Sequence, residues 1–258
     1  MRGLWLLAGS VVTVVALTLS TLGLWHSFAR ASTPTEHTMR SIPFEGQKVR
    51  IAVGRGHVSL WIVSGPAGKV HVQRVLRWSR HRPTVTEDWG AASATLRLDA
   101  TCPGSDQPTG PVCEADYIVA VPPETAVEAG TSGGPLFVEE LFGDLRLTSV
   151  SGNVRVRAVA GDLYARIGTG SFDGDDLGGE RADVEVGSGD VRLTFHKKPS
   201  DVRAVVRTKG DVMVAVPPSP YDVTAEGANT SIDLRQSPGA SRRITASAPD
   251  GIVTLCCR

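Results

Sequence analysis

The most informative segment of the chain is residues 149–180, which read SVSGNVRVRAVAGDLYARIGTGSFDGDDLGGE. Its glycines belong to a series of small-x-Gly corners that continues on both sides of the segment. The glycines of these corners are 19, 18, 19 and 21 residues apart, and the corners are Thr131-Ser132-Gly133, Val150-Ser151-Gly152, Gly168-Thr169-Gly170, Gly187-Ser188-Gly189 and Thr208-Lys209-Gly210. A fixed period of this length indicates a repeat architecture.

A second glycine series lies between these corners. Its members are Gly143-Asp144-Leu145, Gly161-Asp162-Leu163 and Gly179-Glu180-Arg181. Most corners are followed by a short run of alternating apolar and polar residues, such as Asn153-Val154-Arg155-Val156-Arg157. Glycine allows corner dihedrals that a Cβ would forbid, and a neighbouring Asp or Asn can accept a hydrogen bond from the backbone of the turn.

These features predict an all-β fold in which residues 123–258 form a β-solenoid with rungs of about 19 residues. Each rung would turn alternate apolar side chains inward, and it could bury them only by stacking on the next rung. An antiparallel β-sandwich is the alternative, because Gly-Asp corners also suit hairpin turns.

The region before the repeat is expected to contain further strands. Residues 48–122 form an N-terminal β region with period-two alternation, for example at Val58-Ser59-Leu60-Trp61-Ile62-Val63. Residues 26–47 are polar and contain proline, which indicates a linker.

Residues 4–25 contain no charged side chain. A helix of this length would span about 33 Å, and the hydrocarbon core of a bilayer is roughly 30 Å thick. We therefore expect one transmembrane helix, a signal anchor that leaves residues 1–3 in the cytoplasm and the ectodomain outside the cell membrane. A signal peptide cleaved near Ala31 is the alternative, and it would give a secreted protein.

The cysteines agree with export. Cys102 and Cys113 flank a segment rich in Pro and Gly, and a disulfide between them would close a short loop. Free thiols are the alternative. Cys256 and Cys257 are adjacent near the C-terminus, and the sequence assigns them no role.

Composition excludes some functions. The 258 residues carry 27 basic and 27 acidic side chains, which argues against a nucleic-acid partner. No P-loop, nucleophile elbow, dinucleotide fingerprint or zinc-binding pair is present, so we predict no catalytic, cofactor-binding or metal-binding residue and a non-enzymatic protein.

Two sets of acidic residues are candidate sites. Asp173-Gly174-Asp175-Asp176 is interpreted as a solvated turn in preference to a calcium site. Asp144, Asp162 and Glu180 could form an acidic ladder along one edge, but they are interpreted as corner caps.

One set of basic residues was weighed in the same way. Arg155, Arg157, Arg166 and Arg192 could form a stripe that meets an anionic envelope polymer. Ordinary alternation on a solvated face accounts for them as well.

The repeat carries a resemblance to a known family. Val119-Ala120-Val121-Pro122 leads into Val127-Glu128-Ala129-Gly130-Thr131-Ser132-Gly133, and Ser-Gly-Asx-Val and Gly-Asp-Leu corners follow. Roughly residues 115–255 resemble the bacterial "putative adhesin" family of β-strand-repeat domains of unknown function, and the region with the cysteine pair is similar to actinobacterial members. Gly133-Gly134-Pro135 departs from the pattern because it lacks the Asp. The resemblance implies a β-solenoid at the cell envelope.

We therefore expect a membrane-anchored, extracytoplasmic protein that offers an adhesin-like binding or scaffolding surface to a cell-envelope polymer or protein. A solenoid polysaccharide lyase or hydrolase is one alternative, and it would need a pair of carboxylates such as Asp144 and Asp162. A sensory component of the envelope-stress response is another.

Overall fold

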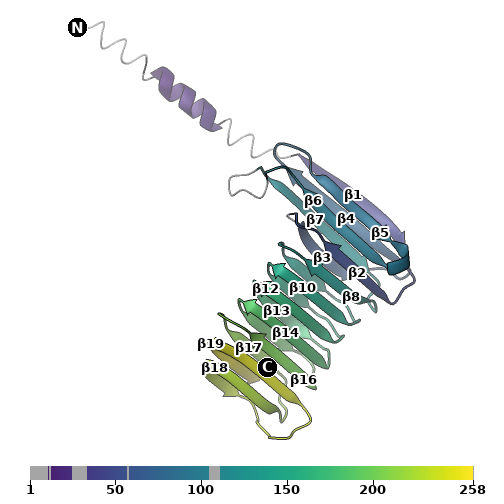
Figure 1. Ribbon diagram of the computed structural model, residues 1–258, viewed down its shortest axis with the longest axis vertical. Coiled ribbons are helices and arrows are strands. Elements are labelled where there is room, and N and C mark those ends of the chain that lie inside the picture. The colour runs from purple at the N-terminus through teal and green to yellow at the C-terminus, as the bar shows by residue number, and fades with distance from the viewer. Residues whose placement is uncertain (1–10, 12, 25–33, 57, 105–110, 258) are drawn as a thin grey trace, which may run out of the picture.

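The computed structural model describes residues 11, 13–24, 34–56, 58–104 and 111–257. In this part of the chain 19 strands join into one hydrogen-bonded array, so the chain is all-β as expected. The strands stack into an elongated body, and the N-terminal helical segment extends away from one end of it (Figure 1).

The first seven strands precede the repeat. They are β1 (Thr35–Pro43), β2 (Lys48–Val53), β3 (Val58–Ser64), β4 (Lys69–Trp78), β5 (Thr84–Gly90), β6 (Thr95–Thr101) and β7 (Cys113–Val121). A short 3₁₀ helix, Ala91–Ser93, lies between β5 and β6.

The remaining strands contain the glycine corners. They are β8 (Ala126–Thr131), β9 (Leu136–Glu139), β10 (Leu145–Ser151), β11 (Val154–Arg157), β12 (Leu163–Thr169), β13 (Phe172–Leu177), β14 (Arg181–Ser188), β15 (Val191–Phe195), β16 (Asp201–Val206), β17 (Val212–Val216), β18 (Asp222–Asp233) and β19 (Arg243–Cys257).

From β8 to β17 each strand pairs with the strand two positions along the chain, and β19 pairs with β16, β17 and β18. Every pair from β8 to β19 is parallel. Strands β2, β8, β10, β12, β14 and β16 form one stack, here called the even stack, and β3, β9, β11, β13, β15 and β17 form the odd stack. Hairpins would give antiparallel pairs, so the antiparallel sandwich is wrong for this region.

The register between neighbouring units follows the glycine period. Leu145 lies opposite Leu163, 18 residues later, and Val191 lies opposite Val212, 21 residues later. Here a unit means one even-stack strand and the odd-stack strand that follows it. Strand β19 is long enough to join both stacks, and its two halves pair with β16 and β17.

The core consists of apolar side chains in register from unit to unit. One buried row crosses the even stack and another crosses the odd stack. The even row is Val127, Leu145, Leu163, Ala182, Val202 and Ile244, and the odd row is Leu136, Val154, Phe172, Val191, Val212 and Val253. A single unit would leave these side chains exposed, so burial requires stacking.

The corner glycines are needed for two reasons. Gly152 and Gly170 have φ angles of 130° and 126°, which side-chain-bearing residues rarely adopt. A Cβ on Gly170 would also collide with the carbonyl oxygen of Gly152 one unit earlier. The corner therefore needs glycine both for its own conformation and for the closeness of the next unit.

The strands before the repeat continue the two stacks. Strand β2 pairs with β8, and β3 pairs with β9, all in parallel. Beyond them β7, β4 and β1 extend the odd stack, while β6 and β5 extend the even stack. The strands on either side of residue 122 thus pair with one another.

Part of the expected linker, residues 26–47, is a strand. Strand β1 forms nine antiparallel residue pairs with β4. Of its residues only Ile42 is buried, because β1 is an edge strand with little of its surface against the core. The alternation of apolar residues that marks a strand is therefore missing from this segment.

The expected membrane anchor falls only partly within the described residues. Residues 13–24 are helical, and their apolar side chains are exposed, Leu22 to 65%. Residues 4–10, 12 and 25 of the anchor, the expected cytoplasmic residues 1–3 and the cleavage site near Ala31 lie outside the described part. Where the structure describes the chain, it contains no helix both long and apolar enough to cross a bilayer.

The predicted disulfide is confirmed. Cys102 and Cys113 are bonded, with their Cα atoms 6.0 Å apart, and they join the end of β6 to the start of β7. Both cysteines are buried. Cys256 and Cys257, at the end of β19, form no disulfide.

Replacing Gly170 by alanine should destabilise the stack strongly. Gly68 is the matched control, since it has a φ of 78° and open space around the position of a Cβ. In urea unfolding we expect Gly68→Ala to cost about 1 kcal/mol for the left-handed conformation alone. Gly170→Ala should cost about 3 kcal/mol or more, because the collision is added. Equal losses for the two variants would contradict the close-stacking explanation.

Candidate binding groove

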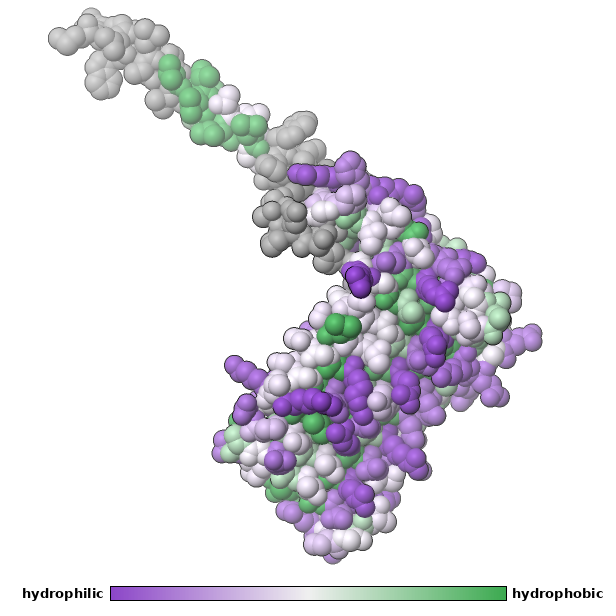
Figure 2. All heavy atoms as spheres, in the orientation of Figure 1, coloured by the Kyte–Doolittle hydropathy of each residue, from purple (hydrophilic) through white to green (hydrophobic). Residues whose placement is uncertain are grey.

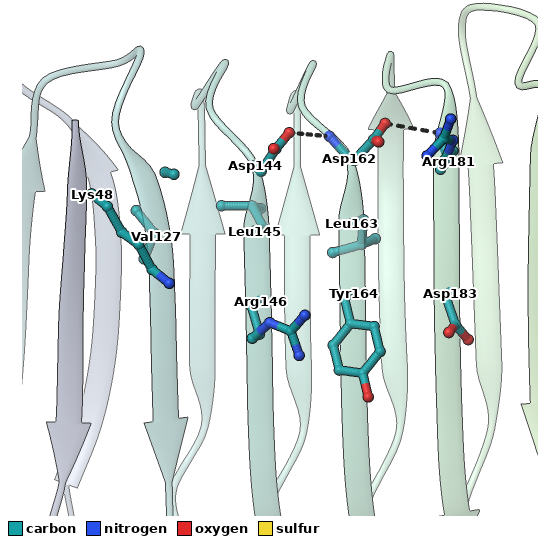
Figure 3. A pocket seen from close by; sticks show the side chains of 11 residues that line it. Lys48, Val127, Asp144, Leu145, Arg146, Asp162, Leu163, Tyr164, Arg181 and Asp183 are labelled. Carbon is teal, nitrogen blue, oxygen red and sulfur yellow. Dashed lines mark hydrogen bonds between the residues drawn. The ribbon is translucent and has the colours of Figure 1, made fainter.

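A shallow groove crosses the outer face of the even stack where its strands begin. Its volume is about 520 Å³. It is lined by Lys48, Ala126, Val127, Asp144, Leu145, Arg146, Asp162, Leu163, Tyr164, Arg181 and Asp183 (Figure 3). These residues come from the start of β2, β8, β10, β12 and β14 or from the corner just before, so the groove runs across neighbouring strands.

The upper edge of the groove in Figure 3 consists of corner aspartates. The backbone N–H of Asp162 donates to Asp144 Oδ1 at 2.9 Å, and the backbone N–H of Arg181 donates to Asp162 Oδ1 at 3.1 Å. Each carboxylate thus accepts a hydrogen bond from the next unit. Asp144 and Asp162 cap corners, as the sequence indicated.

A second ladder of the same kind follows the other glycine series. The N–H of Ser171 donates to Asn153 Oδ1 at 3.0 Å, and the N–H of Asp190 donates to Ser171 Oγ at 3.2 Å. The N–H of Asp211 continues it with Asp190 Oδ1 at 3.0 Å. Asn153, Ser171 and Asp190 thus each accept a backbone N–H of the next unit.

The floor of the groove carries a row of outward side chains in register. Arg146, Tyr164 and Asp183 lie opposite one another on β10, β12 and β14. The guanidinium carbon of Arg146 is 4.3 Å from the centre of the Tyr164 ring, and that of Arg166 is 3.9 Å from it. Cation–π contact at this range holds the ring in place between units.

Two carboxylates on β14 are held by arginines: Asp183, which lines the groove, and Glu185, two residues further along the strand. Asp183 accepts from Arg166 at 2.7 Å and from Arg203 at 2.9 Å. Glu185, only 11% exposed, contacts Arg203 at 3.2 Å and is also paired with Arg207. Burial alone would raise the pKa of both carboxyl groups, but these arginines lower it below the usual value, so both stay ionised at neutral pH.

The three cations that line the groove differ in their ion pairs. Lys48 pairs with Glu128 at 2.9 Å. Within the described part of the chain, the guanidinium groups of Arg146 and Arg181 have no carboxylate within 4.0 Å. Arg146 is exposed. Figure 2 shows other hydrophilic side chains gathered over β8, β14 and β16.

The other acidic residues that the sequence offers as candidate sites lie apart from the groove. Glu180 does not line it; its backbone carbonyl accepts from the N–H of Ser200 at 2.8 Å. Asp173 pairs with Arg155 at 3.5 Å, and Asp176 pairs with His196 at 3.3 Å. Among the described residues, no group of three or more His, Cys, Asp or Glu could hold a metal ion.

The arginine stripe is divided between the two stacks. Arg155 and Arg157 lie on β11 and Arg192 lies on β15, all in the odd stack, whereas Arg166 lies on β12 in the even stack. Arg157 pairs with Glu139 at 3.5 Å, and Arg166 pairs with Asp183. The four do not form one surface.

Sequence reasoning missed Lys48, Arg146 and Tyr164 as groove residues. The sequence did show that three groove residues occupy equivalent positions in the repeat. Each follows a corner glycine or acidic residue of the second series by two or three positions: Arg146, Tyr164 and Asp183. Lys48 lies outside the repeat period, and only the pairing of β2 with β8 brings it there.

In comparisons with known proteins, no family model and no curated protein matches the chain. Among solved structures, the chain is similar to a "putative cell adhesion protein" from Clostridium sporogenes, with 12% identity, a TM-score of 0.42 and coverage of 88% of this chain and 100% of that one.

Two further structures are described as a "putative adhesin". The one from Parabacteroides distasonis has 11% identity, a TM-score of 0.46 and coverage of 85% of this chain and 97% of that one. The one from Bacteroides fragilis has 12% identity, a TM-score of 0.41 and coverage of 86% and 97%.

Substitutions at Asp162 test whether its carboxylate is a corner cap. Asp162→Ala removes the acceptor for the N–H of Arg181 and should lower the free energy of unfolding by about 1 kcal/mol. Asp162→Asn keeps an acceptor oxygen and should stay within about 0.5 kcal/mol of the natural chain. Urea unfolding measures both. An equal loss in the two variants would show that the charge, and not the hydrogen bond, matters.

Proposed function

We propose that this protein is a membrane-anchored, extracytoplasmic β-solenoid that binds a component of the cell envelope through the groove on its even stack. It acts as an adhesin-like binding or scaffolding surface, without catalysis. The bound component is a cell-envelope polymer or protein.

Three features support the solenoid and its export. The parallel register of 18 to 21 residues, as between Leu145 and Leu163 or Val191 and Val212, is the spacing of a β-solenoid coil. The uncharged segment 4–25 has the length of a membrane anchor. The Cys102–Cys113 disulfide is typical of exported proteins.

The observation that carries the binding role is the row of polar groups in the groove. Arg146 is exposed and lies between Glu128 and Tyr164 in register; its guanidinium contacts the Tyr164 ring and, among the described residues, has no carboxylate within 4.0 Å, while Arg166 is held by Asp183. A guanidinium left without a carboxylate, next to a fixed tyrosine, offers hydrogen-bond donors in a set geometry. Such groups bind polar ligands.

The same geometry supports binding over hydrolysis. A glycosidase needs one carboxylate to protonate the leaving group and another to act on the sugar or on water. Asp144 and Asp162 both accept backbone hydrogen bonds that hold successive units together. Their positions and hydrogen bonds are those of structural caps.

The location is tested by protease treatment of intact cells that produce the full chain. An external protease should degrade the chain in intact cells and leave a cytoplasmic marker protein untouched, because the β region lies outside the membrane. A membrane-associated fragment that contains the N-terminal helix should remain. Degradation only after the membrane has been permeabilised would contradict the proposed location.

The groove is tested by binding to cell-envelope fragments. The purified full-length chain should bind the fragments in a sedimentation assay, and Arg146→Ala should weaken binding about tenfold. Arg192→Ala is the matched control, since Arg192 is also exposed but lies in the odd stack. It should bind as the natural chain does. Equal binding by all three proteins would overturn the groove as the binding site.

A further inference from the structure

We propose that the ligand of the groove is an uncharged polysaccharide, which lies across the strands with about one sugar residue for each strand. This inference rests on the proposed binding function and specifies its ligand class. The charges of the groove, the hydrogen-bonding capacity of its side chains and its repeat distance all favour this class of ligand.

The charges that line the groove balance. Of the charged residues that line it, Lys48 is paired with Glu128, and Asp183 with Arg166 and Arg203. The lining charges without an ion pair among the described residues are two cations, Arg146 and Arg181, and two anions, Asp144 and Asp162. An anionic polymer would have to lie against the two carboxylates, and a cationic one against the two guanidinium groups. An uncharged ligand meets neither penalty.

A polyhydroxyl ligand can use both kinds of group. Each sugar hydroxyl donates one hydrogen bond and accepts others, so it can bridge a carboxylate and a guanidinium. Asp144 and Asp162 each accept a backbone N–H, and a carboxylate has capacity for more. Arg146 supplies donors on the floor of the groove, below the corner aspartates in Figure 3.

Tyr164 adds a hydroxyl at a fixed position. Its ring is held against the guanidinium groups of Arg146 and Arg166. Within the described part of the chain no hydrogen bond to its hydroxyl is found, and the residue is half-buried. The hydroxyl can therefore donate to a ligand without breaking an internal bond, and little ordering is needed on binding.

The repeat distance favours a polysaccharide over other linear polymers. Neighbouring strands are about 4.8 Å apart, and a pyranose residue in an extended polysaccharide advances by a closely similar distance. An extended peptide advances only about 3.3 Å per residue. Nucleic acid has a suitable length per unit but carries a charge on each phosphate.

The length of the groove sets the length of the ligand. Its lining comes from five neighbouring strands, from β2 to β14, which span about 19 Å. With about one sugar residue for each strand, the groove accommodates about four to five sugar residues. The volume of about 520 Å³ lies in the range of sites that hold small ligands.

The test uses the full-length chain and oligosaccharides of defined length, measured by calorimetry. The probes are uncharged β-1,4-linked glucose and N-acetylglucosamine oligomers of two to six units, and oligogalacturonates of the same lengths as the anionic series. We expect affinity for at least one uncharged series to rise with length up to about four units and then to level off. The anionic series should bind at least tenfold more weakly.

Variants locate the site. Arg146→Ala should reduce affinity for the uncharged tetramer about tenfold, and Tyr164→Phe, which keeps the ring and removes only the hydroxyl, should reduce it several-fold. Arg192→Ala should have no effect. Unchanged thermal unfolding confirms that each variant is folded, and the mild Tyr164→Phe change keeps the test valid should Arg146→Ala unfold.

Three results would overturn the inference: tighter binding of the anionic series, an affinity independent of length, or no binding of either uncharged series. The failure of the ligand class is distinguishable from failure of the binding function. If Arg146→Ala weakens binding to envelope fragments but no uncharged oligomer binds, the groove is a binding site for another ligand. If the fragments do not bind either, both proposals fail.

Discussion

The structure depends on one constraint: each unit must lie on the next at the distance of a β-ladder, at the corners as well as along the strands. Along the strands, parallel hydrogen bonds and buried rows such as Val127, Leu145 and Leu163 maintain this distance. At the corners the chain turns sharply, and a Cβ on Gly143, Gly152 or Gly161 would meet a carbonyl oxygen of the unit before. Glycine removes that obstacle, and the adjacent Asp, Asn or Ser side chain accepts the N–H donors that the turn leaves free.

The same constraint determines the outer surface. Since equivalent positions of successive units lie in register, an outward side chain always has a neighbour at ladder distance on each side. Arg146, Tyr164 and Asp183 therefore form a row although they are 18 and 19 residues apart in the sequence. Most charged groups in such rows pair with each other, as Asp183 does with Arg166 and Arg203. Among the described residues, a guanidinium in such a row with no carboxylate within 4.0 Å, such as that of Arg146, keeps its hydrogen-bond donors available to a ligand.

Local pattern was sufficient to predict what the corners do, and insufficient to predict what depends on register. The glycine period gave the all-β fold and the capping role of Asp144 and Asp162, because corner chemistry is local. The spacing of Cys102 and Cys113 across a loop predicted their disulfide for the same reason. Strand β1 was missed because an edge strand buries only Ile42. The groove was missed because its parts meet only through pairing, as when β2 brings Lys48 beside β8.

A stack held together by identical contacts has no intrinsic limit, so its ends must prevent further addition. At one end β18 pairs along its length only with β19 within the described residues, and it carries Asp222, Glu226 and Asp233 together with a register shift after Gly227. Charges and irregular register on an edge strand disfavour pairing with another chain.

At the other end the parallel pattern gives way to the antiparallel pairs β1–β4 and β5–β6. A strand that arrives in the parallel sense of the repeat would meet an edge of different hydrogen-bond spacing there. The two ends thus keep a self-complementary repeat finite, and they leave its outer faces as the surface through which it can bind.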